Sequence, residues 1–267
     1  MHNAAFAALG LPHLYLRARV RPDELGTALD EARRLEVGGL NLTVPLKEVA
    51  PPLLDECTPA ACAIGAVNTI IRRGRTLIGD NTDGDGFLRS IRGRVRLGDA
   101  PVVVLGAGGS ARAVAAALAG HGRGPLVLAN RTPRRADQLA DLLARHRHTR
   151  AITTRPLDDP RLLEDAALVV NTTSAGLAGA RLPIRPTRSR PTCLFVDLVY
   201  GRSTPFLAAA TRAGRPGLDG SGMLLHQGAL AFERWLGRPA PLSAMRRALD
   251  GPAPALSRRR PDRRPRA

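Results

Sequence analysis

Residues 101–122, PVVVLGAGGSARAVAAALAGHG, decide the fold class. They begin with a continuous apolar run at 102–105 and continue through a Gly-rich turn into an Ala-rich segment. An apolar run without alternation is typical of a strand that is covered on both faces, and alanine is the strongest helix former. The stretch therefore predicts a buried strand, a tight turn and a helix.

The same order of elements returns at 125–146, PLVLANRTPRRADQLADLLARH. Further short apolar runs follow at 167–177, ALVVNTTSAGL, and at 192–200, TCLFVDLVY. Strands that alternate with helices indicate βαβ units and a parallel sheet. Residues 93–218 are therefore predicted to form a doubly wound parallel sheet, the Rossmann arrangement that binds dinucleotides.

The turn at 106–111, GAGGSA, has the spacing G-x-G-x-x-A through Gly106, Gly108 and Ala111. The first glycine permits the tight turn, the second lets the backbone approach a pyrophosphate, and the small third residue permits close helix packing. Backbone N–H groups at the start of the helix then favour an anion. An ordinary Gly-rich turn is the alternative, but the position directly after an apolar strand favours a dinucleotide site.

The end of the next predicted strand distinguishes NADP from NAD. In NAD-binding chains an Asp or Glu about 20 residues further on binds the ribose 2′-hydroxyl. Here the sequence is ANRTPRR, with Asn130, Arg131, Thr132 and Arg135 and no carboxylate. Arginine suits phosphate because its planar guanidinium donates paired hydrogen bonds. The segment predicts NADP, although two solvated arginines in an Arg-rich chain are the alternative.

The composition limits the other classes of function. The 267 residues carry a net charge of +17, but the charge is spread along the chain without the interleaved aromatic residues of single-strand binders. Part of it lies in the tail at 251–267, whose Pro/Arg-rich composition predicts disorder. We therefore expect no nucleic-acid partner.

No apolar run is long enough for a membrane span, and the first residues lack a secretory signal, so we expect a cytoplasmic protein. The three cysteines, Cys57, Cys62 and Cys193, are scattered and suggest neither disulfides nor a metal site.

The remaining residues predict a second α/β domain formed by 1–92 and 219–250. The segment 28–45 predicts a helix, a Gly-Gly stop and a strand, and 59–87 predicts a helix end followed by strands with Gly turns. Apolar residues recur at helical spacing after 219, which predicts one helix from about 219 to 250.

With these motifs in view, the sequence resembles the shikimate dehydrogenase family. The matching elements occur in the family's order between residues 2 and 236: HNAAF, NLTVPLK, GAVNT, GDNTDGDGF, GAGGSARAV, NRTPRRA, NTTSAGL, DLVY and DGSGMLLHQGALAFERW. The resemblance implies NADPH-dependent reduction of 3-dehydroshikimate to shikimate, in aromatic amino acid biosynthesis.

The resemblance also assigns site residues. It implies that Lys47 is the catalytic lysine and Asp83 its partner. Four polar residues match substrate-binding positions: Thr43, Asn68, Tyr200 and Gln227. The residues expected around NADP are Gly106, Ala107, Gly108, Gly109, Ser110, Asn130, Arg131, Thr132, Arg135, Leu198 and Gly220.

The chemistry supports Lys47 independently. It is the only lysine among 40 basic residues. Hydride reduction of a ketone requires a proton for the developing alkoxide, and arginine, with a pKa above about 12, does not release one. Lysine does, since its pKa responds readily to burial and neighbours. Whether Lys47 acts alone or together with Asp83 stays open.

Two departures from the family pattern are visible. The family has an earlier strand that ends in S-x-S-P, whose two serines bind the substrate carboxylate, whereas this sequence starts with Met1 directly before HN. We expect a start codon assigned too late; a chain that truly lacks the strand is the alternative. Pro59 replaces an acidic residue often found in the family.

Three alternatives to the shikimate assignment stay open: a quinate dehydrogenase, an aminoshikimate dehydrogenase, or an inactive NADP-binding relative. Both a monomer and a homodimer are compatible with the family.

Overall fold

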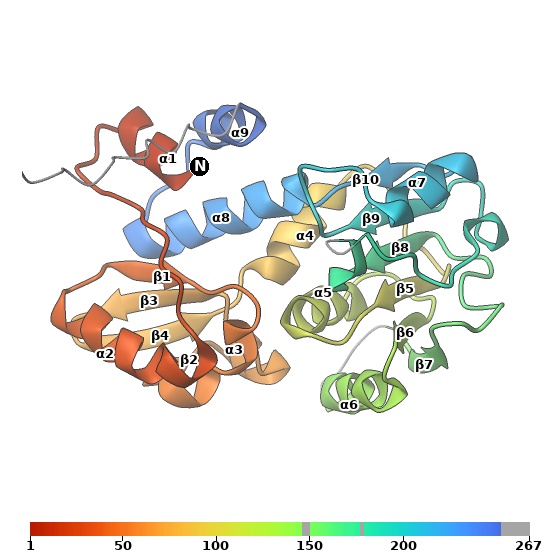
Figure 1. Ribbon diagram of the computed structural model, residues 1–267, viewed down its shortest axis with the longest axis horizontal. Helices are drawn as coiled ribbons and strands as arrows, with labels where there is room; N and C mark the ends of the chain where they lie inside the picture. The colour runs from red at the N-terminus through yellow and green to blue at the C-terminus, as the bar shows by residue number, and fades with distance from the viewer. Residues whose placement is uncertain (146–149, 177–178, 252–267) are drawn as a thin grey trace, which may run out of the picture.

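The computed structural model describes residues 1–145, 150–176 and 179–251, and contains two β-sheets with two helices between them (Figure 1). The predicted disordered tail, 251–267, lies outside the described residues except for Gly251. In the described part of the chain, no helix combines the length and the apolar character that a membrane span requires.

The larger sheet has six parallel strands in the order β10-β9-β8-β5-β6-β7. Counted along the chain from β5, this is the order 3-2-1-4-5-6 of a Rossmann sheet, and it confirms the predicted fold. The strands are β5 (Val102–Leu105), β6 (Leu126–Asn130), β7 (Ile152–Pro156), β8 (Leu168–Asn171), β9 (Leu194–Asp197) and β10 (Gly217–Leu218).

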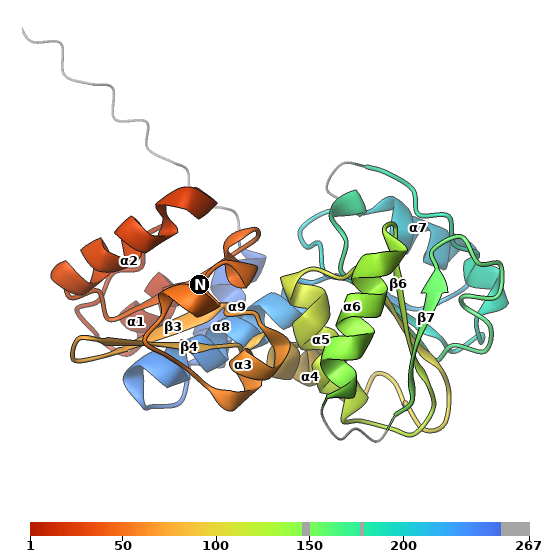
Figure 2. The same ribbon diagram turned by 90° about the horizontal axis from the view of Figure 1, so that it is seen from below.

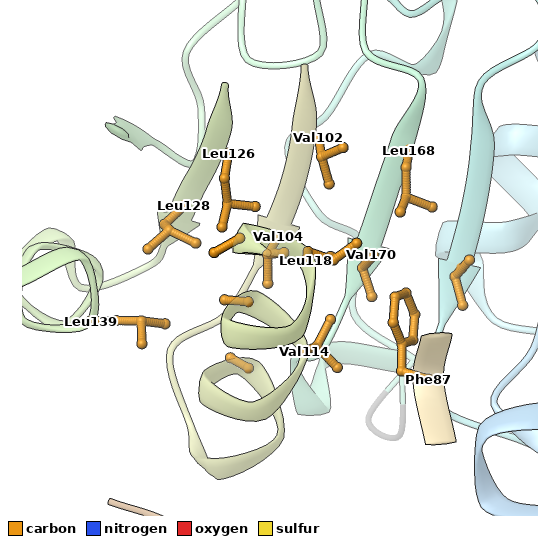
Figure 3. Packing of buried hydrophobic residues seen from close by; sticks show 14 of the residues in the cluster. Phe87, Val102, Val104, Val114, Leu118, Leu126, Leu128, Leu139, Leu168 and Val170 are labelled. Atoms are coloured by element: carbon orange, nitrogen blue, oxygen red, sulfur yellow. The ribbon is translucent and has the colours of Figure 1, made fainter. Parts of the chain in front are cut away.

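Helices cover both faces of this sheet. On one face α5 (Gly109–Ala119) and α6 (Pro133–Ala144) pack against β5, β6 and β8, as Figure 3 shows for Val104, Val114 and Leu118. On the other face α7 (Pro205–Arg212) packs through Phe206. The central strands are fully buried, which explains their uninterrupted apolar sequences.

The smaller sheet has four strands in the order β1-β3-β4-β2, of which only β2 and β4 are parallel. Its strands are β1 (Gly39–Asn41), β2 (Glu56–Cys57), β3 (Thr69–Arg73) and β4 (Thr76–Asp80). The surrounding helices are η1 (Pro22–Glu24), α2 (Leu25–Arg34), η2 (Leu46–Glu48), η3 (Pro51–Leu53) and α3 (Pro59–Ile64).

Pro59 fits its place in this part of the structure. It is the first residue of α3, where its missing N–H removes no helix hydrogen bond. Thr58 caps the same helix, because its Oγ1 accepts a hydrogen bond from the Ala61 N–H at 3.3 Å.

Helix α4 (Asp83–Ile91) corrects the expectation of strands and turns up to residue 87. It packs against both α5 and α8 (Ser221–Leu236). A Cβ atom at Gly84 would lie 2.8 Å from the Ala113 carbonyl oxygen, and one at Gly86 would lie 2.7 Å from the Gln227 nitrogen. The two glycines are therefore needed for close helix packing.

The end of the chain also differs from expectation. Instead of one helix from about 219 to 250, α8 stops before Gly237, and a separate helix α9 (Leu242–Asp250) follows. The α9 helix packs beside α1 (His2–Ala8), so the two ends of the described chain lie together above α8 (Figure 1).

Candidate active site

Lys47 and Asp83 form a close ion pair between the two sheets. Lys47 lies in η2, which follows β1, and Asp83 is the first residue of α4. The Lys47 Nζ donates to Asp83 Oδ2 at 2.6 Å and to Ser110 Oγ at 3.2 Å. The side chains are only 12% and 4% exposed. The ammonium is therefore held between a carboxylate and the Gly-rich turn.

A second side chain fixes the Asp83 carboxylate. Asn68 Nδ2 donates to Asp83 Oδ1 at 2.8 Å, and its Oδ1 accepts a hydrogen bond from the Thr82 N–H at 2.8 Å. Gln227 Oε1, from α8, lies 3.4 Å from the same Asn68 nitrogen. The structure thus brings together Lys47, Asp83, Asn68 and Gln227 from three distant parts of the sequence.

The local sequence explains why Asp83 points into this group. Asn81 Oδ1 accepts a hydrogen bond from the Asp83 N–H at 3.0 Å and so holds the start of α4. Thr82 Oγ1 binds the Gln227 carbonyl oxygen at 3.1 Å and ties the same turn to α8. A carboxylate in the first turn of a helix is also stabilised by the helix dipole.

The Gly-rich turn follows β5 at the carboxyl edge of the larger sheet, beside β8. Strand order reverses between these two strands, which is where open α/β sheets bind ligands. Gly106 has a φ of 114°, and a Cβ atom there would collide with Thr172 Oγ1. A glycine is therefore required at this position both by conformation and by space.

The start of α5 holds an anion that the sequence analysis missed. The Gly109 N–H donates to Glu48 Oε1 at 2.9 Å. Glu48 Oε2 pairs with Arg112 at 3.1 Å and lies 3.9 Å from Arg135. The only hint in the sequence is that a carboxylate directly follows Lys47.

The predicted 2′-phosphate segment lies at the end of β6. Arg131, Thr132 and Arg135 are exposed there, and Asn130 Nδ2 donates to the Thr132 carbonyl oxygen at 3.0 Å. A cavity of about 410 Å³ opens between α5 and α6 next to this segment. It is lined by Ala107, Arg112, Arg135, Gln138, Leu139, Asp141, Leu142 and Arg145, and its charged groups are mainly basic.

Two of the predicted substrate-binding residues lie apart from the group formed by Lys47, Asp83, Asn68 and Gln227. Thr43 and Tyr200 are both exposed, and in the described ranges no hydrogen bond joins either side chain to Lys47, Asp83 or Asn68. The prediction that they bind substrate rests on the matching motifs alone.

Leu198 and Gly220 lie together where β9 ends and α8 begins. A Cβ atom at Gly220 would collide with the Leu198 carbonyl oxygen, and the Gly220 N–H donates to the Val199 carbonyl at 3.1 Å. These contacts place both residues near the carboxyl edge of the larger sheet, two strands away from the Gly-rich turn.

The loop that carries Leu198 and Tyr200 is held by Asp197, a second residue that the sequence analysis missed. The carboxylate is fully buried and accepts hydrogen bonds from Thr204 Oγ1 at 2.7 Å and from the Val199 N–H at 3.1 Å. Burial raises the pKa of Asp197 above its ordinary value.

Family models match three parts of the chain. The shikimate dehydrogenase substrate binding domain matches residues 1–70, the shikimate / quinate 5-dehydrogenase model matches 89–202, and the shikimate 5'-dehydrogenase C-terminal domain matches 220–249. Together they match β1 and β2 of the smaller sheet, β5 to β9 of the larger sheet, and helix α8.

Individual relatives agree with these matches. The chain is 48% identical over 259 residues to a shikimate dehydrogenase (NADP(+)) of Moorella thermoacetica, covering 93% of this chain and 86% of the relative.

Among solved structures, shikimate 5-dehydrogenase from Thermus thermophilus in complex with NADP(H) and shikimate is 39% identical, with a TM-score of 0.81 and coverage of 93% of this chain and 91% of that one. Shikimate dehydrogenase from Aquifex aeolicus is 34% identical, with a TM-score of 0.84 and coverage of 94% and 91%. The chain belongs to the shikimate dehydrogenase family.

Proposed function

We propose that this protein is an NADP-dependent oxidoreductase that reduces 3-dehydroshikimate to shikimate in aromatic amino acid biosynthesis. One observation carries the proposal: the Lys47 ammonium lies 2.6 Å from Asp83 and 3.2 Å from Ser110 in the Gly-rich turn. A proton donor and the dinucleotide-binding turn therefore meet, in a chain that is 48% identical to a shikimate dehydrogenase (NADP(+)).

The described residues fit NADP. The start of α5 already holds an anion, since the Gly109 N–H donates to the Glu48 carboxylate at 2.9 Å. Arg131 and Arg135 supply exposed guanidinium groups for the 2′-phosphate at the end of β6. The residues proposed around the cofactor include Ala107, Gly108, Ser110, Asn130, Thr132, Leu198 and Gly220. When bound, NADPH supplies the hydride.

Lys47 is proposed as the proton donor in reduction and the proton acceptor in oxidation. Its ammonium also stabilises negative charge that develops on the substrate oxygen. Asp83 orients the ammonium, and its own carboxylate is oriented by Asn68 at 2.8 Å. A donor positioned in this way typically accelerates proton transfer by about 10²–10⁴-fold.

Asn68 and Gln227 are proposed to bind the substrate hydroxyls, together with Thr43 and Tyr200. The supporting observation for the first two is their position: Gln227 Oε1 lies 3.4 Å from the Asn68 amide that contacts Asp83. For Thr43 and Tyr200 the support is the family motif in which they occur.

We propose a division into a substrate domain, residues 1–92 and 219–250, and a cofactor domain, residues 93–218. The smaller sheet lies within the first and the larger sheet within the second. Helices α4 and α8 pack against each other, and α4 also packs against α5 (Figure 2). The protein is proposed to act in the cytoplasm, as a monomer or a homodimer.

The test is shikimate oxidation followed by the appearance of NADPH, with parallel reactions on quinate and with NAD⁺. We expect turnover of shikimate with NADP⁺ above the other pairs. A preference for quinate would instead identify a quinate dehydrogenase. NADP⁺ binding without turnover of either substrate would leave an aminoshikimate dehydrogenase or an inactive relative, which a reaction with aminoshikimate separates. Preference for NAD⁺ would contradict the argument from Arg131 and Arg135.

A further inference from the structure

The Glu48 carboxylate lies on the groups that a dinucleotide phosphate would need. Its Oε1 accepts the Gly109 N–H at 2.9 Å at the start of α5. Its Oε2 pairs with Arg112 at 3.1 Å and lies 3.9 Å from Arg135. One backbone donor and two guanidinium groups, the usual set for a phosphate, therefore face a carboxylate of the chain itself.

This contact joins two separate parts of the protein. Glu48 belongs to η2, next to the smaller sheet, while Gly109 and Arg112 belong to α5 on the larger one. The two parts fit closely, since a Cβ atom at Gly109 would lie 3.1 Å from Lys47 Cβ. Glu48 is also the direct neighbour of Lys47, so its position and that of the ammonium are linked through one short helix.

A carboxylate and a phosphate cannot share this position. The single N–H of Gly109 already has its acceptor, and two anions at contact distance repel each other. Binding of a pyrophosphate at the start of α5 therefore requires the Glu48 side chain to leave, and its ion pairs with Arg112 and Arg135 to break.

We propose that Glu48 is an internal competitor of the cofactor, whose carboxylate occupies the phosphate-binding donors and lowers the affinity for NADP. The proposal rests on the proposed function, because it assumes that the start of α5 binds the dinucleotide phosphates. Glu48 is a residue that determines affinity, and it takes no part in the proton transfer.

The test is calorimetric titration of the whole protein with NADP⁺, and separately with inorganic pyrophosphate. The Glu48→Gln variant keeps the size and the acceptor oxygen but loses the negative charge. We expect this variant to bind NADP⁺ about threefold to tenfold more tightly than the unchanged protein. The reason is that the phosphate no longer has to displace a charged carboxylate from its hydrogen-bond donors. The affinity for inorganic pyrophosphate should also rise, since pyrophosphate presents only the phosphate groups of the cofactor.

Glu56→Gln is the matched control. It makes the same change in net charge at an exposed residue of β2, away from the Gly-rich turn. Glu48→Ala provides a second variant at the site itself, and thermal unfolding reports whether each variant is folded. If both Glu48 variants bind NADP⁺ more tightly and the control binds it as the unchanged protein does, the result supports competition between the Glu48 carboxylate and the cofactor phosphate.

The opposite result has a clear meaning. If Glu48 instead holds Arg112 and Arg135 in place for the cofactor, both Glu48 variants will bind NADP⁺ equally well or more weakly, and the proposal is overturned. This outcome is distinct from failure of the proposed function, which is measured separately as absence of shikimate turnover by the unchanged protein.

Discussion

Lys47 is held by acceptors from two different segments, which restricts the position of its ammonium. Asp83 and Ser110 lie 36 and 63 residues further along the chain, yet both contact the same nitrogen. An arginine could keep the charge and the ion pair. It could not release the proton, because its pKa stays above about 12.

Replacing Lys47 by arginine therefore separates charge from proton transfer. We expect Lys47→Arg to lower kcat for shikimate oxidation by about 10²–10⁴-fold while leaving NADP⁺ binding within a few-fold of normal. The control is Arg33→Lys, the reverse exchange at an ion-paired position in α2, which should leave kcat unchanged. Near-normal turnover of Lys47→Arg would refute the proton role.

Arg131 offers a test of cofactor preference. The Arg131→Ala variant should raise the KM for NADP⁺ by about tenfold, through the loss of a charge-assisted hydrogen bond to the 2′-phosphate. The KM for NAD⁺, which lacks that phosphate, should not change. Arg134→Ala is the matched control, because Arg134 is exposed three residues further on, at the start of α6, but is not among the proposed cofactor residues. Equal effects on both cofactors would exclude recognition of the 2′-phosphate.

Sequence motifs indicate which residues matter but not all of their contacts. The motifs pointed to Lys47 and Asp83, whose roles stay a prediction, as well as to the turn at Gly106. They did not point to Glu48 or Asp197, since the partners of these carboxylates are backbone N–H groups and side chains that only the folded chain brings near. Residues whose importance depends on tertiary contacts leave no periodic or spaced pattern in one sequence.

Helix α4 connects the two halves of the molecule through its small residues. It carries Asp83 at its start, contacts α5 at Gly84 and contacts α8 at Gly86, and its Phe87 reaches the core of the larger sheet (Figure 3). Because Gly86 contacts Gln227 and lies three residues after Asp83, the packing of α4 on α8 helps to position both side chains.

The Gly86→Ala variant tests this packing. Its Cβ atom would lie 2.7 Å from the Gln227 nitrogen, and a backbone neighbour cannot rotate away. We expect a loss of about 1–3 kcal/mol in the free energy of unfolding, measured with urea, together with a higher KM for shikimate.

Gly26→Ala is the control for this experiment. Gly26 lies within α2, and a Cβ atom there meets nothing within 4 Å. Alanine should stabilise that helix by up to about 1 kcal/mol without affecting the KM. If Gly86→Ala behaved like Gly26→Ala, the close packing of α4 on α8 would not be needed for stability.

Four strands of the larger sheet, β5, β6, β8 and β9, could be predicted from their continuous apolar runs. Strands β7 and β10 could not, since β7 has the sequence ITTRP and β10 has only two residues. Helix α4 could not, since the two glycines in DGDGF have low helix propensity and suggested turns, while packing on α5 and α8 favours them. The break between α8 and α9 had a visible signal in Gly237, Pro239 and Pro241, which follow the last apolar position.

At the scale of the whole molecule, the two ends of the described chain share one apolar cluster. Phe6 of α1 packs with Phe232 of α8 and Met245 of α9. Figure 1 shows these three helices next to one another. Next to it the ring of His2 lies 4.5 Å from that of Tyr15 and 5.1 Å from that of Trp235, measured between centroids. No local pattern could predict the contacts of Phe6 with Phe232 and of His2 with Trp235, because these partners are more than 200 residues apart along the chain.

His2 makes this cluster sensitive to acid. Burial lowers its pKa from 6.5 to about 4, so the folded protein keeps the imidazole neutral while the unfolded chain protonates it below about pH 6.5. Between these values the unfolded state binds more protons, and stability falls as the pH falls. The stabilisation is complete above pH 6.5 and is lost towards pH 4, with a total of about 3 kcal/mol.

The measurement is urea unfolding at a series of pH values from 4 to 7 on the full chain. His2→Phe keeps an aromatic ring against Tyr15 and Trp235, and it loses no hydrogen bond at Nδ1, which has no partner among the described residues. Its stability should fall less steeply with acid than that of the unchanged protein. The control is His13→Phe, at an exposed histidine, which should keep the original slope. Equal slopes in all three proteins would place the acid sensitivity at another group, such as His226, whose pKa burial also lowers.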